Sequence, residues 1–407
     1  MSTHLTDLAA AKAFFRRHFG YTPPHVVRAP GRVEILGNHT DYNLGLMLSA
    51  AIDRYVYMAA SPRSDGKIEI ASSAFPDQKE KFWLSRLEKN PESPWTDYVK
   101  GVLQQLRKRK VHFSGFSATY HSTIPIGSGL GSSSAMTVAT ALMVRQLYPF
   151  QLTETGASGP PKRLRNDDLP PLPPKQRLYM AQLCRAAENE FVGVQSGLLD
   201  PVSSLLGKEF HVVQTDFMYQ SVERLPFIGE IALVLCDSGV TPPRTEGGFR
   251  ERRELCEAAA RAMRAKSLRS IEPADLSGHK KALTRRQHDC AYHIVGENQR
   301  VVYGEKALRE EDFVQFGQYL LQSHESSRDF FRNSTPELDL LVEIARDHPA
   351  CLGARLTGGG FGGATINLVQ WTHVDAFMKH MTLHYGRRTG RLLLPKRLKM
   401  VDGAEVL

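Results

Sequence analysis

Residues 125–135 read Pro-Ile-Gly-Ser-Gly-Leu-Gly-Ser-Ser-Ser-Ala, and they run directly into 135–143, an apolar stretch that is typical of a helix. Because glycine has no Cβ, alternating glycines let a loop turn tightly and bring its backbone N–H groups close to an anion. The N-terminus of the following helix adds free N–H donors and the positive end of its dipole. This combination predicts a phosphate-binding loop. The alternative is a flexible turn followed by a serine that caps the helix.

The loop differs from two common phosphate-binding motifs. No lysine follows a glycine ahead of the serines, as a Walker A loop requires. The glycines are spaced Gly-x-Gly-x-Gly, and no acidic strand end follows at the distance of a dinucleotide-binding fingerprint. We therefore expect a metal ion and an arginine from elsewhere in the chain to balance the charge of the phosphate.

The composition is that of a globular protein. The chain has 407 residues, of which 42% are hydrophobic and 23% charged, which is enough to bury two cores. Its 52 basic and 43 acidic residues give a net charge of +9. The basic residues are scattered among acids, with no basic run beside aromatic residues. We therefore expect a charged surface that attracts anionic substrates, and no nucleic-acid partner.

The cysteines and the N-terminal residues indicate in which cellular compartment the protein is located. The five cysteines are widely spaced, odd in number and without a Cys-x-x-Cys pair, which favours free thiols in a reducing compartment and no zinc site. Residues 1–7 lack the apolar region of a signal peptide, and no apolar run is long enough to span a bilayer. These features predict a cytoplasmic protein without a membrane partner.

A second polar segment covers 28–43, where we expect a strand, a turn, a second strand and a polar turn. Five hydrogen-bonding side chains crowd it: Arg32, Asn38, His39, Asp41 and Tyr42. Such a density of donors and acceptors suits a ligand with many hydroxyl groups. The alternative is a capped loop whose acidic and amide side chains bond only the local backbone.

Two further features carry chemistry. Asp200 stands in an apolar stretch twelve residues after Glu188. Burying an ionised carboxylate among apolar residues is costly unless the carboxylate is paired or functional. The alternative is an aspartate that caps a helix before Pro201.

Residues 358–363 hold five glycines, which suggests a backbone surface packed closely against the first glycine loop. The alternative for this second cluster is a bulge or hairpin.

The remaining chain alternates between apolar periodicities of strands and helices. Residues 153–174 are rich in proline and polar residues, which predicts a mobile surface insertion. The expected helices are 5–19, 95–107, 176–191, 249–264, 279–308, 311–324 and 336–348. The expected strands are 45–60 (as two strands), 67–72, 113–121, 210–217, 231–236 and 364–370.

In the order 31–43, 125–135 and 357–363, these motifs resemble those of the GHMP kinase superfamily, small-molecule kinases named for galactokinase, homoserine kinase, mevalonate kinase and phosphomevalonate kinase. The first motif resembles the galactokinase signature, and the similarity covers most of the chain outside 153–174. It implies an α/β (α+β) fold of two domains, 1–220 and 221–407, with the active site in the cleft between them. It also implies transfer of the γ-phosphoryl group of MgATP to the anomeric C1 hydroxyl of a sugar. We expect a monomer whose partners are the sugar and ATP.

The resemblance also implies roles for individual residues. Asp200 matches the aspartate beside the C1 hydroxyl, as a base or an electrostatic guide, and Arg32 the arginine that lowers that hydroxyl's pKa and steadies the phosphoryl group. Glu188 and Ser133 match magnesium ligands. The sugar-contact positions are Asn38, His39, Asp41, Gly197 and Phe249. The ATP contacts are Trp95, in the adenine pocket, and Gly127, Gly129, Leu130, Gly131, Ser132, Ser133 and Ser134 of the loop.

The sequence departs from the galactokinase pattern at the sugar positions. That family usually has glutamate where Asn38 stands and asparagine where Glu34 stands, and its sugar-contacting tyrosine aligns with Phe249. Because the family's glutamate helps to hold the C6 hydroxyl, the exchange predicts weaker discrimination at C6, unless Glu34 reaches the same place. The acceptor could then be galactose, galacturonate or arabinose. A sugar sensor without activity is a further alternative, against which Asp200, Arg32, Glu188 and the loop serines argue.

Overall fold

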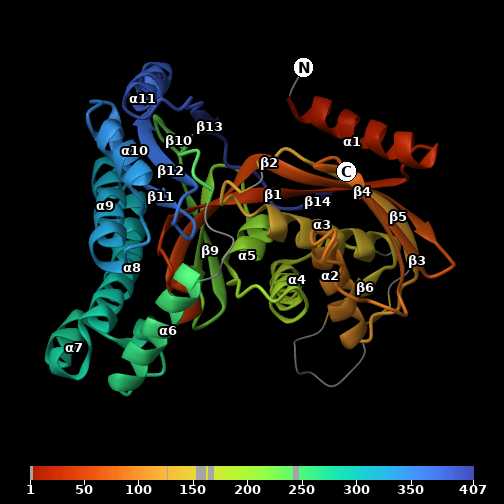
Figure 1. The fold of residues 1–407 in the computed structure, drawn as a ribbon, viewed down its shortest axis with the longest axis horizontal. Coiled ribbons are helices and arrows are strands. Elements are labelled where there is room, and N and C mark those ends of the chain that lie inside the picture. Colours follow the sequence, from red (N-terminus) through yellow and green to blue (C-terminus); the bar gives the residue numbers. More distant parts are fainter. Residues whose placement is uncertain (1–2, 126, 153–161, 164–168, 242–246) are drawn as a thin grey trace.

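A computed structural model describes residues 3–125, 127–152, 162–163, 169–241 and 247–407 (Figure 1). Its strands are β1 (His25–Leu36), β2 (Leu46–Arg63), β3 (Lys67–Ser72), β4 (Phe75–Trp83), β5 (Gly115–Ser122), β6 (Phe150–Gln151), β7 (Lys162–Arg163), β8 (His211–Asp216), β9 (Ser221–Pro226), β10 (Ile231–Asp237), β11 (Cys351–Thr357), β12 (Ala364–Gln370), β13 (Lys396–Leu398) and β14 (Glu405–Val406). Its α-helices are α1 (Thr3–Phe19), α2 (Thr96–Lys108), α3 (Ser132–Leu147), α4 (Pro174–Ala186), α5 (Leu199–Leu206), α6 (Gly247–Ala262), α7 (Pro273–Gly278), α8 (Arg285–Arg309), α9 (Phe313–Ser326), α10 (Pro336–Arg346) and α11 (Val374–Thr389). The short helical segments that the site uses are η1 (Asp41–Asn43), η3 (Ala187–Val192) and η6 (Ser327–Phe331), the last two being π-helical turns.

An eight-stranded sheet occupies one half of the molecule. Its strands run in the order β14-β1-β2-β5-β3-β4, and the β8–β9 hairpin joins it beside the first part of β2. The long strand β2 organises this sheet, because it pairs with β8 over residues 46–49 and with β5 over 56–63. Its partner β1 is irregular between Pro30 and Arg32 and between Glu34 and Leu36.

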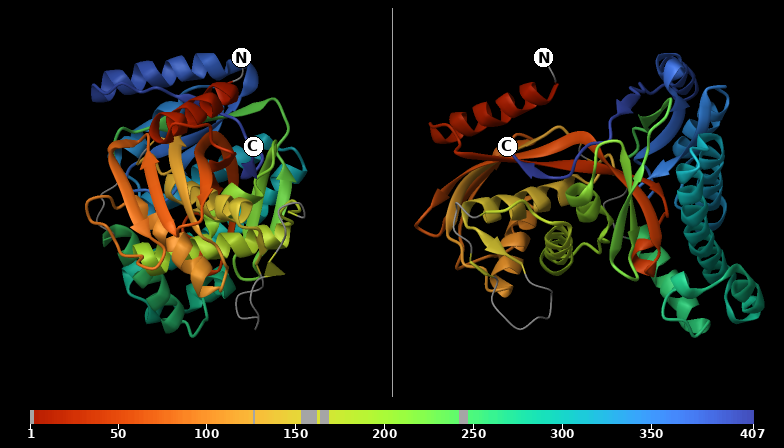
Figure 2. Two further views of the ribbon diagram at one scale, coloured as in Figure 1. Left: turned by 90° about the vertical axis from the view of Figure 1, so that its right-hand side faces the viewer. Right: turned by 180° about the vertical axis from the view of Figure 1, so that it is seen from behind.

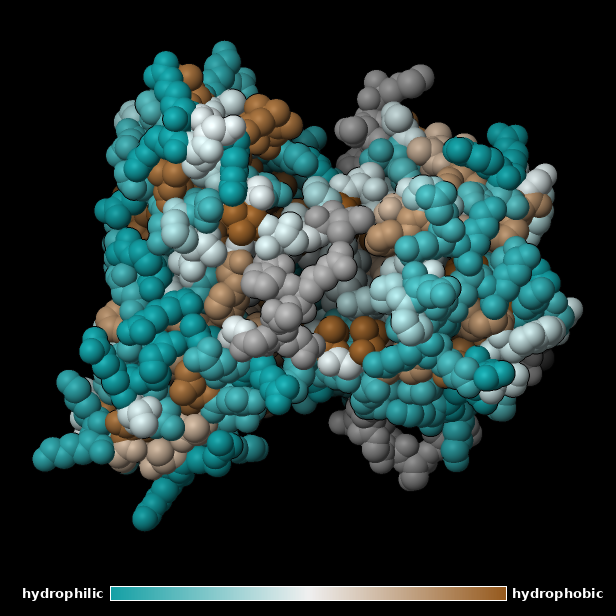
Figure 3. Space-filling model, in the orientation of Figure 1, coloured by the Kyte–Doolittle hydropathy of each residue, from teal (hydrophilic) through white to brown (hydrophobic). Residues whose placement is uncertain are grey.

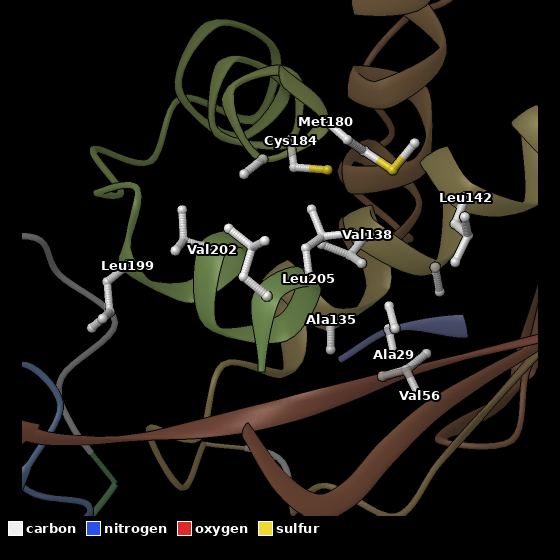
Figure 4. Close-up of a cluster of buried hydrophobic side chains, with 14 of the residues drawn as sticks. Ala29, Val56, Ala135, Val138, Leu142, Met180, Cys184, Leu199, Val202 and Leu205 are labelled. Carbon is white, nitrogen blue, oxygen red and sulfur yellow. The ribbon is translucent and has the colours of Figure 1, made fainter. Parts of the chain in front are cut away.

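Strands β1 and β2 of this sheet are mostly buried on both faces, as expected for strands that are covered on both sides. On one face, Tyr55 and Tyr57 pack with Ala11 and Phe15 of α1, which crosses the top of the sheet in Figure 1. The alternating residues point to the other face, where α2, α3, α4 and α5 lie. Figure 4 shows side chains of α3, α4 and α5 meeting above β1 and β2, among them Val138, Met180, Cys184, Val202 and Leu205.

A four-stranded antiparallel sheet, in the order β11-β12-β10-β13, occupies the other half. Helices α10 and α11 cover one of its faces, where Val234, Leu341 and Phe377 are fully buried together. From behind, in Figure 2, α8 and α9 run along the outer side of this half. The opposite residues of the sheet, including Leu233 and Ile366, join the main core cluster, so that a continuous apolar core links the two sheets.

Hydrophilic residues cover most of the face drawn in Figure 3, with hydrophobic residues in small groups. Within the described residues, no helix is both long and apolar enough to cross a membrane. The mixed α/β architecture confirms the predicted fold class.

Several predicted elements were wrong in detail. Residues 45–60 form one strand instead of two, and the two strands expected within 28–43 are the single irregular strand β1. The helix expected from residue 279 begins at Arg285, because Thr284 and Gln287 form a capping box there.

The end of the predicted insertion packs on the rest of the protein, and the sheet topology bears on the predicted domain boundary. Most of 153–174 lies outside the described residues, but its end is packed: Leu172 is buried, and Arg145 donates to the carbonyl of Pro170. The division into 1–220 and 221–407 stays a prediction. Since β9 pairs with β8 across residue 220, and β14 returns to the first sheet, a boundary after Pro226 fits the sheet topology better.

Helix α9 lies unusually close to β11 at two facing glycines. A Cβ added to Gly317 would overlap the carbonyl of Leu352, and a Cβ added to Gly353 would overlap the backbone of Gly317. We expect Gly317→Ala to lower the free energy of unfolding by about 3 kcal/mol, because the clash is with backbone and cannot relax by a side-chain rotation. Gly278→Ala is the control, since a Cβ there meets no atom within 4 Å. Denaturant unfolding of both variants checks this, and equal stabilities would contradict the close approach.

Candidate active site

A cavity of about 350 Å³ lies where the end of β1 meets the glycine loop after β11. Segments far apart in the sequence supply its walls: β1, η1, β2, α2, the start of α3, η3 and the loop after it, the start of α5, the start of α6, and the loop after β11. The residues that line it are Arg32, Glu34, His39, Asp41, Met47, Tyr98, Ser133, Glu188, Val194, Gln195, Ser196, Gly197, Leu199, Asp200, Phe249, Arg250, Gly358 and Gly359.

Arg32 and Asp200 form a two-pronged ion pair at this cavity. Arg32 Nε donates to Asp200 Oδ1 at 2.7 Å, and Nη2 donates to Oδ2 at 2.8 Å. The side chain of Arg32 is 9% exposed and that of Asp200 is 24% exposed. A forked arrangement of this kind fixes both partners in orientation as well as in distance. The pair brings together strand β1 and the first turn of α5.

The predicted phosphate loop lies beside this ion pair. Gly127, Gly129 and Gly131 all have positive φ, which glycine adopts without strain. Gly131 precedes the first residue of α3, and a Cβ there would lie 3.3 Å from Asp200 Oδ2. Arg32 also donates to the carbonyl of Gly129, and its backbone N–H donates to the carbonyl of Leu130 at 2.9 Å. The N-terminus of α3, with its free N–H groups, therefore adjoins the ion pair.

The second glycine cluster packs against the first, as the sequence predicts. A Cβ on Gly358 would lie 3.2 Å from the carbonyl oxygen of Gly129, and one on Gly363 would lie 3.6 Å from that of Ser128. Both glycines have positive φ. The contact at Gly358 is the tighter of the two, so a side chain there would press on the carbonyl of Gly129.

Glu188 is the most buried acid of the cavity wall. It lies at the start of the π-helical turn η3, is 2% exposed, and accepts a hydrogen bond from Ser134 Oγ at 2.6 Å. Burial raises the pKa of its carboxyl to about 7, against which the Ser134 hydrogen bond acts. Ser133 lines the same cavity. π-Helical turns often occur at functional sites, where they redirect a side chain.

These oxygen donors fit a magnesium ion. The described residues contain no group of three or more His, Cys, Asp or Glu side chains that could hold a metal. Magnesium, however, usually takes only one or two carboxylates and completes its shell with water and substrate phosphates. The Glu188 carboxylate and the Ser133 hydroxyl, beside a phosphate-binding loop, are a donor set of that type.

His39 is held as a neutral ring. Its Nε2 lies 3.0 Å from the carbonyl oxygen of Gly359, and its Nδ1 lies 3.0 Å from the Tyr42 hydroxyl. Because a carbonyl only accepts, Nε2 carries the proton and the hydroxyl donates to Nδ1. Burial lowers the pKa of His39 to about 4. The rings of Phe249 and Phe331 pack on the imidazole at 4.9 and 4.7 Å between centroids.

Asp41 and Gly197 are in direct contact across the cavity wall. A Cβ on Gly197 would overlap Asp41 Oδ2, so only glycine leaves room for the carboxylate. Burial raises the pKa of Asp41 to about 6, and the charges of Glu34 and Asp200 add to that shift. Four acids therefore share the cavity, while its described lining supplies two basic side chains, Arg32 and Arg250.

Glu34 and Asn38 have different positions from those the sequence predicts. Glu34 lines the cavity, whereas Asn38 is fully buried and does not. Asn38 Nδ2 donates to Glu34 Oε1 at 2.7 Å and to the carbonyl of Gly358 at 2.9 Å. Arg355, also fully buried, donates to the same Glu34 oxygen at 3.0 Å. Asn38 therefore lies behind Glu34 and outside the cavity lining, and its assignment as a sugar contact stays a prediction.

Trp95 lies apart from the residues that line this cavity. It is buried in the main core, stacked on Phe75 at 6.2 Å and edge-on to Tyr120. Its indole Nε1 is buried without a hydrogen-bond partner among the described residues. The assignment of Trp95 to an adenine pocket stays a prediction.

Several residues of the site were missed from the sequence. Glu297 on α8 accepts hydrogen bonds from the backbone N–H groups of Gly37 and Asn38, at 2.9 and 2.7 Å, and so fixes the turn after β1. Asn333 donates to Asn38 Oδ1 at 2.8 Å. Neither residue has a local signal, because each acts on a segment more than 250 residues away. Glu34 did have a local signal, because it lies two residues after Arg32 on the same strand and its side chain therefore points to the same face.

Comparison with known protein families gives three matches along the chain. Residues 13–62 match the model described as "Galactokinase galactose-binding signature", 97–157 match "GHMP kinases N terminal domain", and 305–377 match "GHMP kinases C terminal". A galactokinase of Chloroflexus aurantiacus is 36% identical over 394 residues, which is 96% of this chain and 95% of that protein. A human galactokinase is 34% identical over 407 residues, covering 98% of this chain and 96% of that protein.

Solved structures of a galactokinase and of another kinase also resemble this chain. The structure of Lactococcus lactis galactokinase complexed with galactose superposes with a TM-score of 0.88 at 28% identity, covering 98% of this chain and 99% of that one. A mevalonate kinase superposes with a TM-score of 0.60 at 17% identity, covering 93% of this chain and 99% of that one, which shows a shared fold alone.

The raised pKa of Glu188 predicts a pH dependence of stability. An unfolded chain ionises Glu188 near the ordinary glutamate pKa of 4.5, whereas the folded protein keeps the proton until about pH 7. Between these values the folded state holds more protons, so the free energy of unfolding falls as the pH rises. Glu188→Gln should remove this decrease in the free energy of unfolding. Above pH 7 the variant should therefore be more stable than the wild type by on the order of 3 kcal/mol.

Denaturant unfolding between pH 4.5 and 8 without ligands measures this difference, with the exposed Glu92→Gln as the control. Parallel curves for wild type and Glu188→Gln would show that the carboxylate is not desolvated.

Proposed function

The chain belongs to the galactokinase family of the GHMP kinases, and on this premise we propose that it transfers the γ-phosphoryl group of ATP to the C1 hydroxyl of galactose. The observation that carries the proposal is the Arg32–Asp200 ion pair, which adjoins both a sugar-sized cavity and the N-terminal end of α3. A galacturonate kinase is the weaker candidate, because a carboxylate, Glu34, faces the cavity.

In this proposal the sugar occupies the cavity lined by Glu34, Asp41 and Phe249. Its C1 hydroxyl approaches Asp200, which accepts the hydroxyl hydrogen bond and orients the oxygen toward the phosphate loop. Arg32 keeps a positive charge beside the oxygen as negative charge develops on it. Phosphoryl transfer needs little covalent help from a protein, so positioning and charge balance supply most of the rate enhancement.

The nucleotide phosphates would lie on the loop 127–134, whose glycines allow close approach and whose helix N-terminus favours an anion. Glu188 and Ser133 would hold magnesium, which supplies charge neutralisation at the phosphates. Both residues line the cavity next to Asp200. Trp95, whose buried indole N–H has no hydrogen-bond partner among the described residues, would contact the adenine.

We also propose a cytoplasmic enzyme. All five cysteines are free, and four of them are buried, which suits a reducing compartment.

The proposed reaction predicts sugar-dependent release of ADP from MgATP. The experiment compares galactose with galacturonate, arabinose, glucose and N-acetylgalactosamine at equal concentration. We expect galactose to give the highest kcat/KM, and the phosphate should be found on C1 by NMR of the product. Binding of galactose without any turnover would instead identify a sugar sensor.

Asp200→Asn tests the ion pair as the reaction centre. The amide can no longer accept a proton from the hydroxyl or balance Arg32, so turnover should fall by about three decades, or roughly 4 kcal/mol in barrier height. Galactose and nucleotide binding, measured by calorimetry, should persist. The exposed Asp77→Asn on β4 is the matched control. Near wild-type turnover in a folded Asp200→Asn would remove Asp200 from the reaction.

A further inference from the structure

The exchange of acid and amide between positions 34 and 38 leaves a carboxylate facing the cavity. Arg32 and Glu34 are two residues apart on β1, so both side chains point to the same side of the strand, and both line the cavity. Arg32 is occupied by Asp200. Glu34 is the next side chain along that wall.

One oxygen of the Glu34 carboxylate is fully used, and the other is not. Oε1 accepts from Asn38 Nδ2 at 2.7 Å and from Arg355 Nη2 at 3.0 Å. Oε2 has no hydrogen-bond partner among the described residues, and it is not among the buried polar atoms that are closed off from solvent. Since the whole residue is only 4% exposed, its remaining access is into the cavity.

Arg355 and Asn38 hold this carboxylate in one orientation. Arg355 is 0% exposed and also donates to the carbonyl of Ile35 at 2.9 Å, so its guanidinium is tied to the same strand. Burial raises the pKa of Glu34 above its usual range, and the charge of Arg355 and the hydrogen bond from Asn38 counter only part of that rise. A buried carboxylate with one satisfied and one open oxygen is a strong, directed acceptor.

Asn38 has no capacity left for a ligand. Its Nδ2 donates to Glu34 and to the carbonyl of Gly358, and its Oδ1 accepts from Asn333 Nδ2 at 2.8 Å. It is 0% exposed. Asn38 therefore acts on a bound sugar only through Glu34, as a positioning residue.

We propose that Glu34 selects the acceptor sugar: its open carboxylate oxygen accepts a hydrogen bond from a neutral sugar hydroxyl and repels an anionic substituent at the same place. The proposal rests on the sugar kinase function proposed above. The sequence predicted relaxed selection unless Glu34 reaches the place of the family's glutamate, and the open oxygen of Glu34 supports that exception. A site built to bond a hydroxyl rejects analogues that lack it, because the buried acceptor is then left unpaired.

The first test uses the wild-type enzyme with a panel of sugars. The kcat/KM values of galactose, galacturonate and the four single deoxygalactoses (2-, 3-, 4- and 6-deoxy) are compared. We expect galactose to exceed galacturonate by about 100-fold or more, and one deoxy sugar to lose a comparable factor because Glu34 is left without its donor. Equal rates with galactose and galacturonate would overturn the proposal.

The second test assigns that selection to Glu34. Glu34→Gln keeps the shape and removes the charge, so the preference for galactose over galacturonate should narrow by about tenfold or more, mainly through KM for the sugar. The penalty on the one sensitive deoxy sugar should shrink, and the others should not change relative to galactose. Asn38→Ala should shift the same ratio in the same direction with KM for MgATP unchanged. Glu69→Gln, a partly buried acid on β3 paired with Lys81, is the control that should leave all ratios as in the wild type.

Sugar binding measured without nucleotide tests the contact of Glu34 with the sugar independently of the kinase activity. Calorimetry with galactose alone measures the contact even if no sugar is phosphorylated, in which case the kinase proposal fails and the loss of binding in Glu34→Gln still reports on the contact. An unchanged sugar ratio and unchanged galactose binding in Glu34→Gln would show that the carboxylate only holds Arg355.

Discussion

A buried ion pair between Glu34 and Arg355 joins the two sheets at the floor of the cavity. Arg355 on β11 donates to the Glu34 side chain and to the Ile35 carbonyl, both on β1. Thr357 adds hydrogen bonds with the backbone N–H and carbonyl of Glu34, at 2.9 and 3.0 Å. Breaking a buried pair by removing one partner costs about 3–5 kcal/mol, because the other charge is left uncompensated. This contact holds β11, and with it the start of the glycine loop that follows, beside the cavity end of β1.

The segments that carry the chemistry could be predicted because their signals are local. The alternating glycines predicted a tight loop, in which Gly127, Gly129 and Gly131 have positive φ, and the half-buried strand 67–72 follows from its alternation. The contact between the two glycine clusters could also be inferred, because so many glycines in one loop serve close backbone approach. The Arg32–Asp200 pair spans 168 residues, so only the resemblance to a family could bring its partners together.

The orientation of Asn38 could not be predicted, and the reason is a change of backbone direction. Gly37 has a φ of 94° and His39 a φ of 59°, so the alternation of β1 does not continue through this turn. A position-by-position comparison keeps the place of a residue in the chain, but not the direction of its side chain. The same limit applies to Trp95, whose burial depends on Phe75 and Tyr120 from other elements.

The strand β14 ties the order of synthesis to the completeness of the first sheet. Glu405 and Val406 pair with β1, and Arg28 lies 377 residues before its ion-pair partner Glu405. At a ribosomal rate of about 5–20 residues per second, the outer edge of β1 stays uncovered for roughly 20–75 s after that strand has been made. An open strand edge is a template for pairing with other chains. Until residues 405–406 are made, that edge of β1, the strand that also carries Arg32 of the cavity, is therefore open to pairing with other chains.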